Sequence, residues 1–272
     1  MKDHQIALLS PIFTNLVIWK ECYLSKFNKS NNTLLSNFEN YSHNKIKQTI
    51  ALTNCLLADF FLEKEKINGL NESQSILFNP LSFFSIGETM HSFLIAKLLN
   101  PNSEHGQGNL FLKSFLKKLD IEVYENDNWI VTAERGRIDI LIKRQNPHAV
   151  IVIENKSNFA IDQENQLYRY WHQEIYLPNE KQFGGKTVEK TTNNKHYRLI
   201  YLTPADWKIP SNNAQLKPKG YNKDLPNTIP ITPEIWLFSN QIVEWLTQST
   251  NQLNKENHRL REYIKQYIEL WK

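Results

Sequence analysis

The stretch RGRIDILIKRQNPHAVIVIENKSNFAIDQENQLYRY, residues 135–170, contains two short apolar runs, 138–142 and 149–153. Valine, isoleucine and leucine dominate both runs, which is typical of strands buried on both faces. The turn-forming residues 145–148 separate the runs. We therefore predict that the two runs are the strands of a β-hairpin.

Charged residues lie at the ends of these predicted strands. Asp139 lies near the start of the first run, and Glu154 and Lys156 follow the second. A buried carboxylate costs several kcal/mol unless it is paired or holds a metal ion. The position of these charges therefore needs a physical reason.

The composition is that of a folded, mildly basic protein. The chain has 272 residues, is 40% hydrophobic and contains seven tryptophans, so it can form a sizeable core. A net charge of +4 is compatible with a nucleic-acid partner without establishing one. No apolar run approaches the roughly 20 residues needed to span a bilayer. We expect a cytoplasmic protein with no membrane partner.

The element order predicts an α/β fold. Residues 1–78 have helical spacing and are expected to form a helical N-terminal layer, with the polar residues 26–33 as a loop between two helices. In the domain expected at 79–272, strands 129–133 and 197–203 add to the hairpin. A strand-helix-strand order implies a parallel pair, so the sheet is mixed. A polar loop at 208–228 and C-terminal helices complete this domain.

A helix is expected to begin near Ser85, where Ser85-Ile-Gly-Glu88 matches a capping box. In that interpretation Glu88 caps the helix. In a second interpretation Glu88, His91 and Ser92 lie on one helical face beside the hairpin, where the Glu88 carboxylate could reach a metal ion, and Met90 and Phe93 face the core.

Another helix is expected at 162–177, with Asp162 as its N-cap. Leu167 should face the sheet, whereas Gln166 and Tyr170 should lie near the strand that carries Glu154.

Two carboxylates on adjacent strands form a hard oxygen site that suits Mg²⁺ or Mn²⁺. Side chains two residues apart on a strand share a face, so Lys156 should lie beside Glu154 and stabilise charge on a phosphoryl group. Asn155 points away, but its carbonyl could be a ligand. The competing interpretation is a Glu154–Lys156 salt bridge with Asp139 as a solvated strand residue.

The segments GRIDILI (136–142), IVIENK (151–156) and QENQLYRY (163–170) resemble the PD-(D/E)XK nuclease superfamily. The upstream motifs ETMHS (88–92) and HGQG (105–108) resemble one group within it. The proline that precedes the superfamily's Asp is replaced by Ile138. The resemblance implies an α/β/α restriction-endonuclease-like core with a mixed central sheet. It also implies an active centre of Glu88, Asp139, Glu154 and Lys156, assisted by Gln166.

We therefore expect a metal-dependent nuclease that uses Mg²⁺ or Mn²⁺ and acts on DNA, with metal ligands from Glu88, Asp139, Glu154 and Asn155. The alternative is a non-catalytic nucleic-acid-binding protein that keeps the fold, and a dimer remains open. Candidate nucleic-acid contacts are Arg137, His105, Lys143, Arg169 and Tyr170. Their alternative roles are solvated strand-end charge for Arg137 and Lys143, turn formation for His105, and helix packing for Tyr170.

Overall fold

The computed structural model describes residues 2–124 and 127–272 and, within the first helix, side chains from residue 15 onward. The chain divides into two compact units, Met1–Phe78 and Asn79–Lys272. Among the described residues, no helix combines the length and apolar character needed to cross a membrane.

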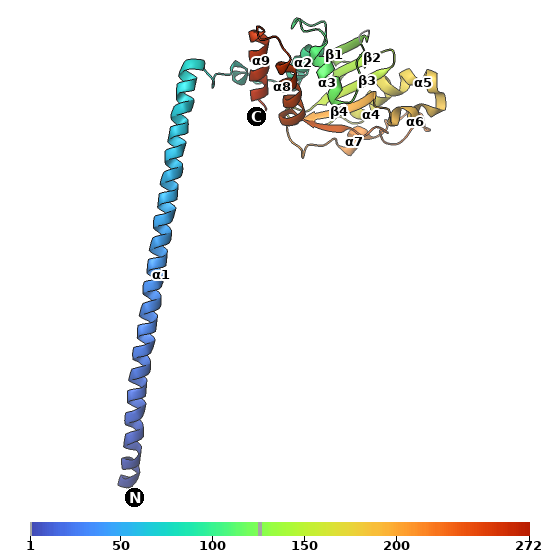
Figure 1. Cartoon of the computed structure of the whole chain (residues 1–272). Helices are drawn as coiled ribbons and strands as arrows, with labels where there is room; N and C mark the ends of the chain where they lie inside the picture. The colour runs from blue at the N-terminus through green and yellow to red at the C-terminus, as the bar shows by residue number, and fades with distance from the viewer. Residues whose placement is uncertain (1, 125–126) are drawn as a thin grey trace. The chain divides into compact units, whose positions relative to one another are not determined.

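The first unit contains one long helix, α1 (Lys2–Gln74; Figure 1). The loop predicted at 26–33 is wrong, because these residues lie inside α1. The segment contains neither proline nor glycine, and the Thr33 hydroxyl donates to the Lys29 carbonyl at 2.8 Å, within the helix. None of the described side chains of α1 is buried.

The second unit is built on a mixed five-stranded sheet in the order β1-β2-β3-β4-β5. The hairpin prediction is confirmed, because β2 pairs with β3 in antiparallel fashion across the 145–148 turn, and β1 pairs antiparallel with β2. The β3–β4 and β4–β5 pairs are parallel, as the strand-helix-strand order predicted for the first of them. The strands are β1 (Trp129–Arg135), β2 (Ile138–Arg144), β3 (Ala149–Asn155), β4 (Tyr197–Thr203) and β5 (Glu234–Leu237). The four-residue β5 has too little alternation to stand out from the sequence.

Helices cover both faces of this sheet, which confirms the predicted α/β/α arrangement (Figure 1). One core lies against Ile140, Ile142 and Ile151 and includes side chains of α2 (Glu88–Leu99), α3 (Leu110–Lys118), α8 (Val243–Asn251) and α9 (His258–Glu269). The other core lies against Val150 and Val152 and includes side chains of α4 (Gln166–Tyr170) and the π-helical turn η2 (Trp171–Tyr176). Leu167 packs in this second core, as its spacing predicted.

Short helical segments connect these elements. They are η1 (Pro80–Phe83), α5 (Leu177–Phe183), η3 (Gly184–Lys186), α6 (Thr187–Thr192), α7 (Asn212–Gln215) and η4 (Phe238–Ile242). Apart from α7, residues 208–228 are irregular, in agreement with the predicted loop. We call residues 204–231, between β4 and β5, the arm.

The buried face of α2 differs from the prediction. Met90 and Phe93 are exposed, whereas His91 and Ser92 are buried. Tertiary partners explain this inversion: His91 Nδ1 lies 2.9 Å from the Tyr267 hydroxyl, and Ser92 Oγ accepts from the Asn155 side chain at 3.1 Å. A polar side chain that has a hydrogen-bonding partner can be buried at little cost. The spacing of apolar residues alone therefore predicted the wrong buried face for α2.

Candidate active site

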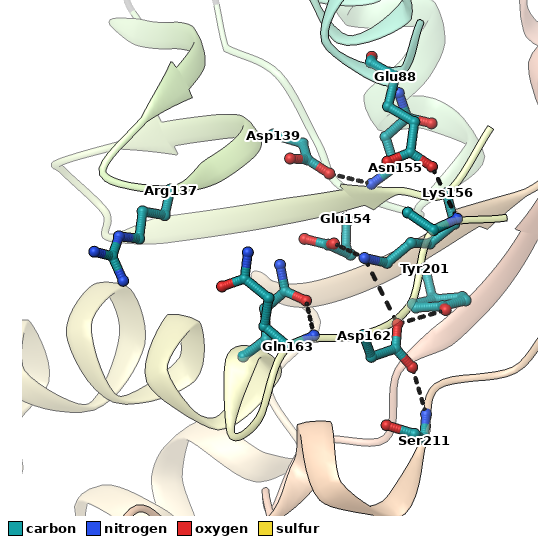
Figure 2. A network of polar contacts seen from close by, with 12 residues as sticks. Glu88, Arg137, Asp139, Glu154, Asn155, Lys156, Asp162, Gln163, Tyr201 and Ser211 are labelled. Atoms are coloured by element: carbon teal, nitrogen blue, oxygen red, sulfur yellow. Dashed lines mark hydrogen bonds and ion pairs between the residues drawn. The ribbon is translucent and has the colours of Figure 1, made fainter. Parts of the chain in front are cut away.

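The register of the hairpin brings Asp139 and Glu154 together. Ile140 pairs with Ile153, so Asp139 and Glu154 are one step further along the two strands, on the face that α4 covers. Glu154 is 2% exposed, and the backbone N–H of Asn155 donates to Asp139 Oδ2 at 2.6 Å. Two carboxylates of like charge are thus fixed side by side below the surface (Figure 2).

Burial and the neighbouring Glu154 carboxylate raise the pKa of Asp139 to about 8. Burial also raises the pKa of Glu154. Glu154 Oε2 is buried and, among the described residues, has no hydrogen-bonding partner. An unsatisfied carboxylate oxygen beside a second carboxylate is a favourable place for a divalent cation, which supplies positive charge and oxygen coordination. Asp139 and Glu154 therefore fit the metal ion that their residue types suggested.

Lys156 lies on the same face, two residues beyond Glu154. Its ammonium group forms ion pairs with Glu154 Oε1 at 2.7 Å and with Asp162 Oδ1 at 3.7 Å (Figure 2). Burial alone would lower the pKa of Lys156, but the Glu154 charge and hydrogen bond raise it overall. Lys156 is therefore a cation held in the centre of the acidic cluster.

Glu88 is adjacent to this centre but has different partners. It is the first residue of α2, where Gly87 and not Ser85 is the N-cap, so the predicted capping box does not form. Glu88 Oε1 accepts the backbone N–H groups of Asn158 at 3.1 Å and Ala160 at 3.3 Å. No cluster of three or more His, Cys, Asp or Glu side chains suited to a metal ion occurs among the described residues. In this conformation Glu88 orders the loop that follows β3.

Asn155 is directed toward α2, as predicted from strand alternation. Its side-chain amide donates to the Glu88 carbonyl at 2.8 Å, and its side-chain oxygen accepts from the Ser157 N–H at 3.0 Å. The side chain is thus held against α2, away from the carboxylate pair, so the backbone carbonyl is the Asn155 oxygen that a metal ion at this pair could use.

The two predicted residues of α4 form a buried pair beneath the centre. The Gln166 side-chain amide donates to the Tyr170 hydroxyl at 2.8 Å, and this hydroxyl donates to the Arg137 carbonyl. Tyr170 is 2% exposed, so its ring packs in the core and is not placed to stack on a base. Burial raises the pKa of Tyr170. The pair fixes the start of α4 against the hairpin.

The other side chains predicted to contact nucleic acid differ in whether they already have partners within the protein. Both ring nitrogens of His105 bond to the backbone of its own loop, at Asn100 and Gln107, which is the turn role. Lys143 pairs with Glu174 at 2.9 Å, and Arg169 donates to Gln163 at 3.3 Å. Arg137 is exposed, and its side chain is turned away from Asp139 and Glu154 (Figure 2).

Three acidic or hydroxyl groups of the site were missed by sequence reasoning. Asp162 was predicted as an N-cap, but α4 begins at Gln166 and Asp162 instead accepts from the Tyr201 hydroxyl at 2.8 Å and the Ser211 N–H at 2.7 Å. Glu134, at a φ of 52°, adds like charge near Asp139. The third group is the Tyr201 hydroxyl. The parallel β3–β4 register pairs Glu154 with Tyr201, and this pairing brings the hydroxyl close to the site.

A cleft of about 420 Å³ lies on the outer part of the same sheet face, over β1 and β2. Its lining includes Thr132, Arg135, Leu141 and Lys143. Leu141 shares its strand face with Asp139, two residues away, so the cleft lies next to the carboxylate pair. Thr132 Oγ1 is buried there without a hydrogen-bonding partner among the described residues.

The mixed sheet thus presents an aspartate, a glutamate and a lysine on one face at the end of its central hairpin. A model of the PD-(D/E)XK nuclease superfamily matches residues 78–269, and the chain belongs to this superfamily. Comparison with curated proteins and with solved structures finds no match. The fold is thus restriction-endonuclease-like, while the narrower group suggested by the ETMHS and HGQG motifs stays a prediction.

Proposed function

We propose that this protein is a Mg²⁺- or Mn²⁺-dependent nuclease that hydrolyses phosphodiester bonds in DNA. The observation that carries the proposal is the convergence of Asp139, Glu154 and Lys156 on one buried face. Membership of a nuclease superfamily supports the reaction class. The choice of DNA follows the same resemblance.

Asp139 and Glu154 are the proposed ligands of the cation, together with the Asn155 carbonyl. A bound divalent cation would polarise the phosphoryl oxygens and lower the pKa of water. Asp139 already has one oxygen fixed by the Asn155 N–H, so its other oxygen is oriented without further ordering. Glu88 would join the ligands only if its carboxylate left the 158–160 amides.

Lys156 is the proposed electrostatic catalyst. Its ammonium group is held 2.7 Å from Glu154, so it lies where a phosphate oxygen beside the carboxylate pair would carry negative charge. Gln166 assists indirectly, because it fixes the Tyr170 hydroxyl that anchors the hairpin at Arg137.

The cleft next to Asp139 supports a polymeric substrate. Arg135 and Lys143 line it and could contact phosphates on one side of the scissile bond. For Lys143 to do so, its ion pair with Glu174 must first break.

The decisive experiment is a cleavage assay over single- and double-stranded DNA and RNA with Mg²⁺, Mn²⁺ or EDTA. We expect cleavage by the wild type that EDTA abolishes and that Lys156→Ala reduces by about 10²- to 10³-fold. The control is Lys190→Ala, which removes an exposed lysine from α6. Binding of nucleic acid without cleavage, unchanged in Lys156→Ala, would instead identify a non-catalytic binding protein.

A further inference from the structure

An exposed aromatic pair lies next to the proposed active centre. The rings of Phe159 and Trp207 are stacked with centroids 5.1 Å apart and an interplanar angle of 1°. Phe159 is 44% exposed and Trp207 is 69% exposed. Ile161 and Ile209 beside them in sequence are also exposed, at 90% and 61%. Large apolar side chains that gather at the surface indicate a binding site.

The loop that carries Phe159 is fixed in place. The Phe159 N–H donates to the Lys156 carbonyl at 2.9 Å, and Glu88 holds the N–H groups on either side of Phe159. Phe159 has a φ of 59°, a left-handed conformation that bulky residues rarely adopt. Such strain persists where the surrounding bonds enforce it, and it is concentrated at functional sites.

Trp207 is fixed from the other side, in the arm. The Lys208 N–H donates to the Ala205 carbonyl at 3.2 Å, and four residues beyond Trp207 the Ser211 N–H donates to Asp162 Oδ2 at 2.7 Å. Asp162 in turn pairs with Lys156. Both rings are therefore connected by short segments to the residues that surround the lysine.

The chemistry of this pair suits a nucleobase. A flat ring stacks on a base whatever its sequence, and proteins that bind single strands combine such rings with positive charge. Bases inside a duplex already stack on each other, so an unpaired base is the one that stacks on a protein ring at the lowest cost. Lys156 and Lys208 place positive charge close to the rings in sequence, three residues before Phe159 and one residue after Trp207.

We propose that Phe159 and Trp207 form a platform on which an unpaired nucleobase of the substrate stacks, next to the scissile phosphodiester. This proposal rests on the proposed nuclease function. It assigns the substrate class: single-stranded DNA, or a duplex with an unpaired end, loop or flipped base.

The test uses binding, so that it does not depend on turnover. In a Lys156→Ala background, fluorescence anisotropy would compare a single-stranded oligonucleotide with the matching duplex. We expect Trp207→Ala and Phe159→Ala to weaken single-strand binding by roughly 5- to 150-fold each, the range for loss of one stacked base. Trp207→Phe should retain most of the affinity. Leu177→Ala, which removes an exposed apolar side chain from α5, is the matched control.

Abasic oligonucleotides make the test specific. An abasic site scanned along the strand should weaken binding at one or two positions, and at those positions Trp207→Ala should cause no further loss. The proposal is overturned if Trp207→Ala weakens single strand and duplex equally, or if no abasic position matters. It is also overturned if Trp207→Ala leaves nucleic-acid binding intact and abolishes self-association, because the platform would then be a protein interface.

The two proposals fail in different ways. If the protein with Lys156 cleaves no nucleic acid, the nuclease proposal fails, while the abasic scan still decides whether the platform exists. If it cleaves DNA and the aromatic variants bind and cleave normally, only the platform fails.

Discussion

Asp139 Oδ2 accepts the backbone N–H of Asn155 at 2.6 Å, so the side chain of one hairpin strand is fixed by the main chain of the other. This bond sets the position of Asp139 next to Glu154. It favours the charged form of Asp139, yet burial and the Glu154 charge outweigh it. The pair is therefore ordered but electrostatically unfavourable, and a bound cation would relieve this repulsion.

The first prediction concerns cation binding. Mg²⁺ or Mn²⁺ should raise the melting temperature at pH 8, because a cation that binds only the folded chain stabilises it by about 2.7 kcal/mol at 100 times its Kd. Asp139→Asn and Glu154→Gln should abolish this rise in differential scanning calorimetry. Glu164→Gln, which changes an exposed carboxylate near Asp162, should keep it. An equal rise in every variant would place the cation elsewhere.

The second prediction concerns pH in the presence of EDTA. The pKa of Asp139 in the folded protein is about 8, above its ordinary value of 3.8, so the folded chain binds more protons than the unfolded chain between these values. The unfolding free energy should therefore fall as pH rises from about 4 to 8, by an amount on the order of a few kcal/mol. Asp139→Asn should remove this part of the slope in urea titrations. A variant that keeps the wild-type slope would show that Asp139 does not carry it.

The third prediction concerns Asp162. It would keep a negative charge near Lys156 if Glu154 bound a cation. Asp162→Asn should therefore lower kcat by about 10²-fold through misplacement of the ammonium group, with little change in KM. In a Lys156→Ala background the same substitution should have almost no effect on turnover. Additive losses would mean that Asp162 acts independently of Lys156. Tyr201→Phe, which removes one hydrogen bond to Asp162, should give a smaller loss of the same kind.

The fourth prediction concerns the cleft over β1 and β2. If Arg135 contacts a phosphate, Arg135→Ala should reduce the slope of log binding constant against log salt by about 1. Lys143→Ala should have a smaller effect, because Lys143 already has Glu174 as a partner. These slopes would be measured by anisotropy in a Lys156→Ala background. A slope that matches that of the Lys190→Ala control would exclude a phosphate contact at Arg135.

The sequence predicted the parts of the site that depend on local periodicity. Alternation along a strand placed Lys156 beside Glu154, and the hairpin turn placed Asp139 opposite them. The same local reasoning failed at Asp162, because an aspartate before a helix is typical of a cap, whereas its actual partners, Tyr201 and Ser211, are about 40 and 50 residues away. No spacing rule connects residues at that separation.

The buried face of α2 shows a second limit of prediction from sequence patterns. Hydrophobic periodicity assigns Met90 and Phe93 to the core, but these side chains are exposed, and the Tyr267 hydroxyl provides His91 with a buried partner instead. Burial lowers the pKa of His91 to about 4, so it is a neutral core residue at physiological pH. The cost of burying a polar side chain depends on a partner supplied by another helix, which the sequence of α2 does not contain.

The central strand β3 should protect the proposed centre against local unfolding. Every residue of β3 is buried, and β3 pairs on both edges, with β2 and with β4. We expect the amides of such a strand to exchange with solvent mainly through unfolding of the whole domain. Glu154 lies on this strand and Lys156 directly follows it, so we expect their surroundings to be among the last parts of the domain to open. On heating, the geometry of the centre should persist to the global unfolding transition, while the arm that carries Trp207 loosens at lower temperature and alters substrate binding first.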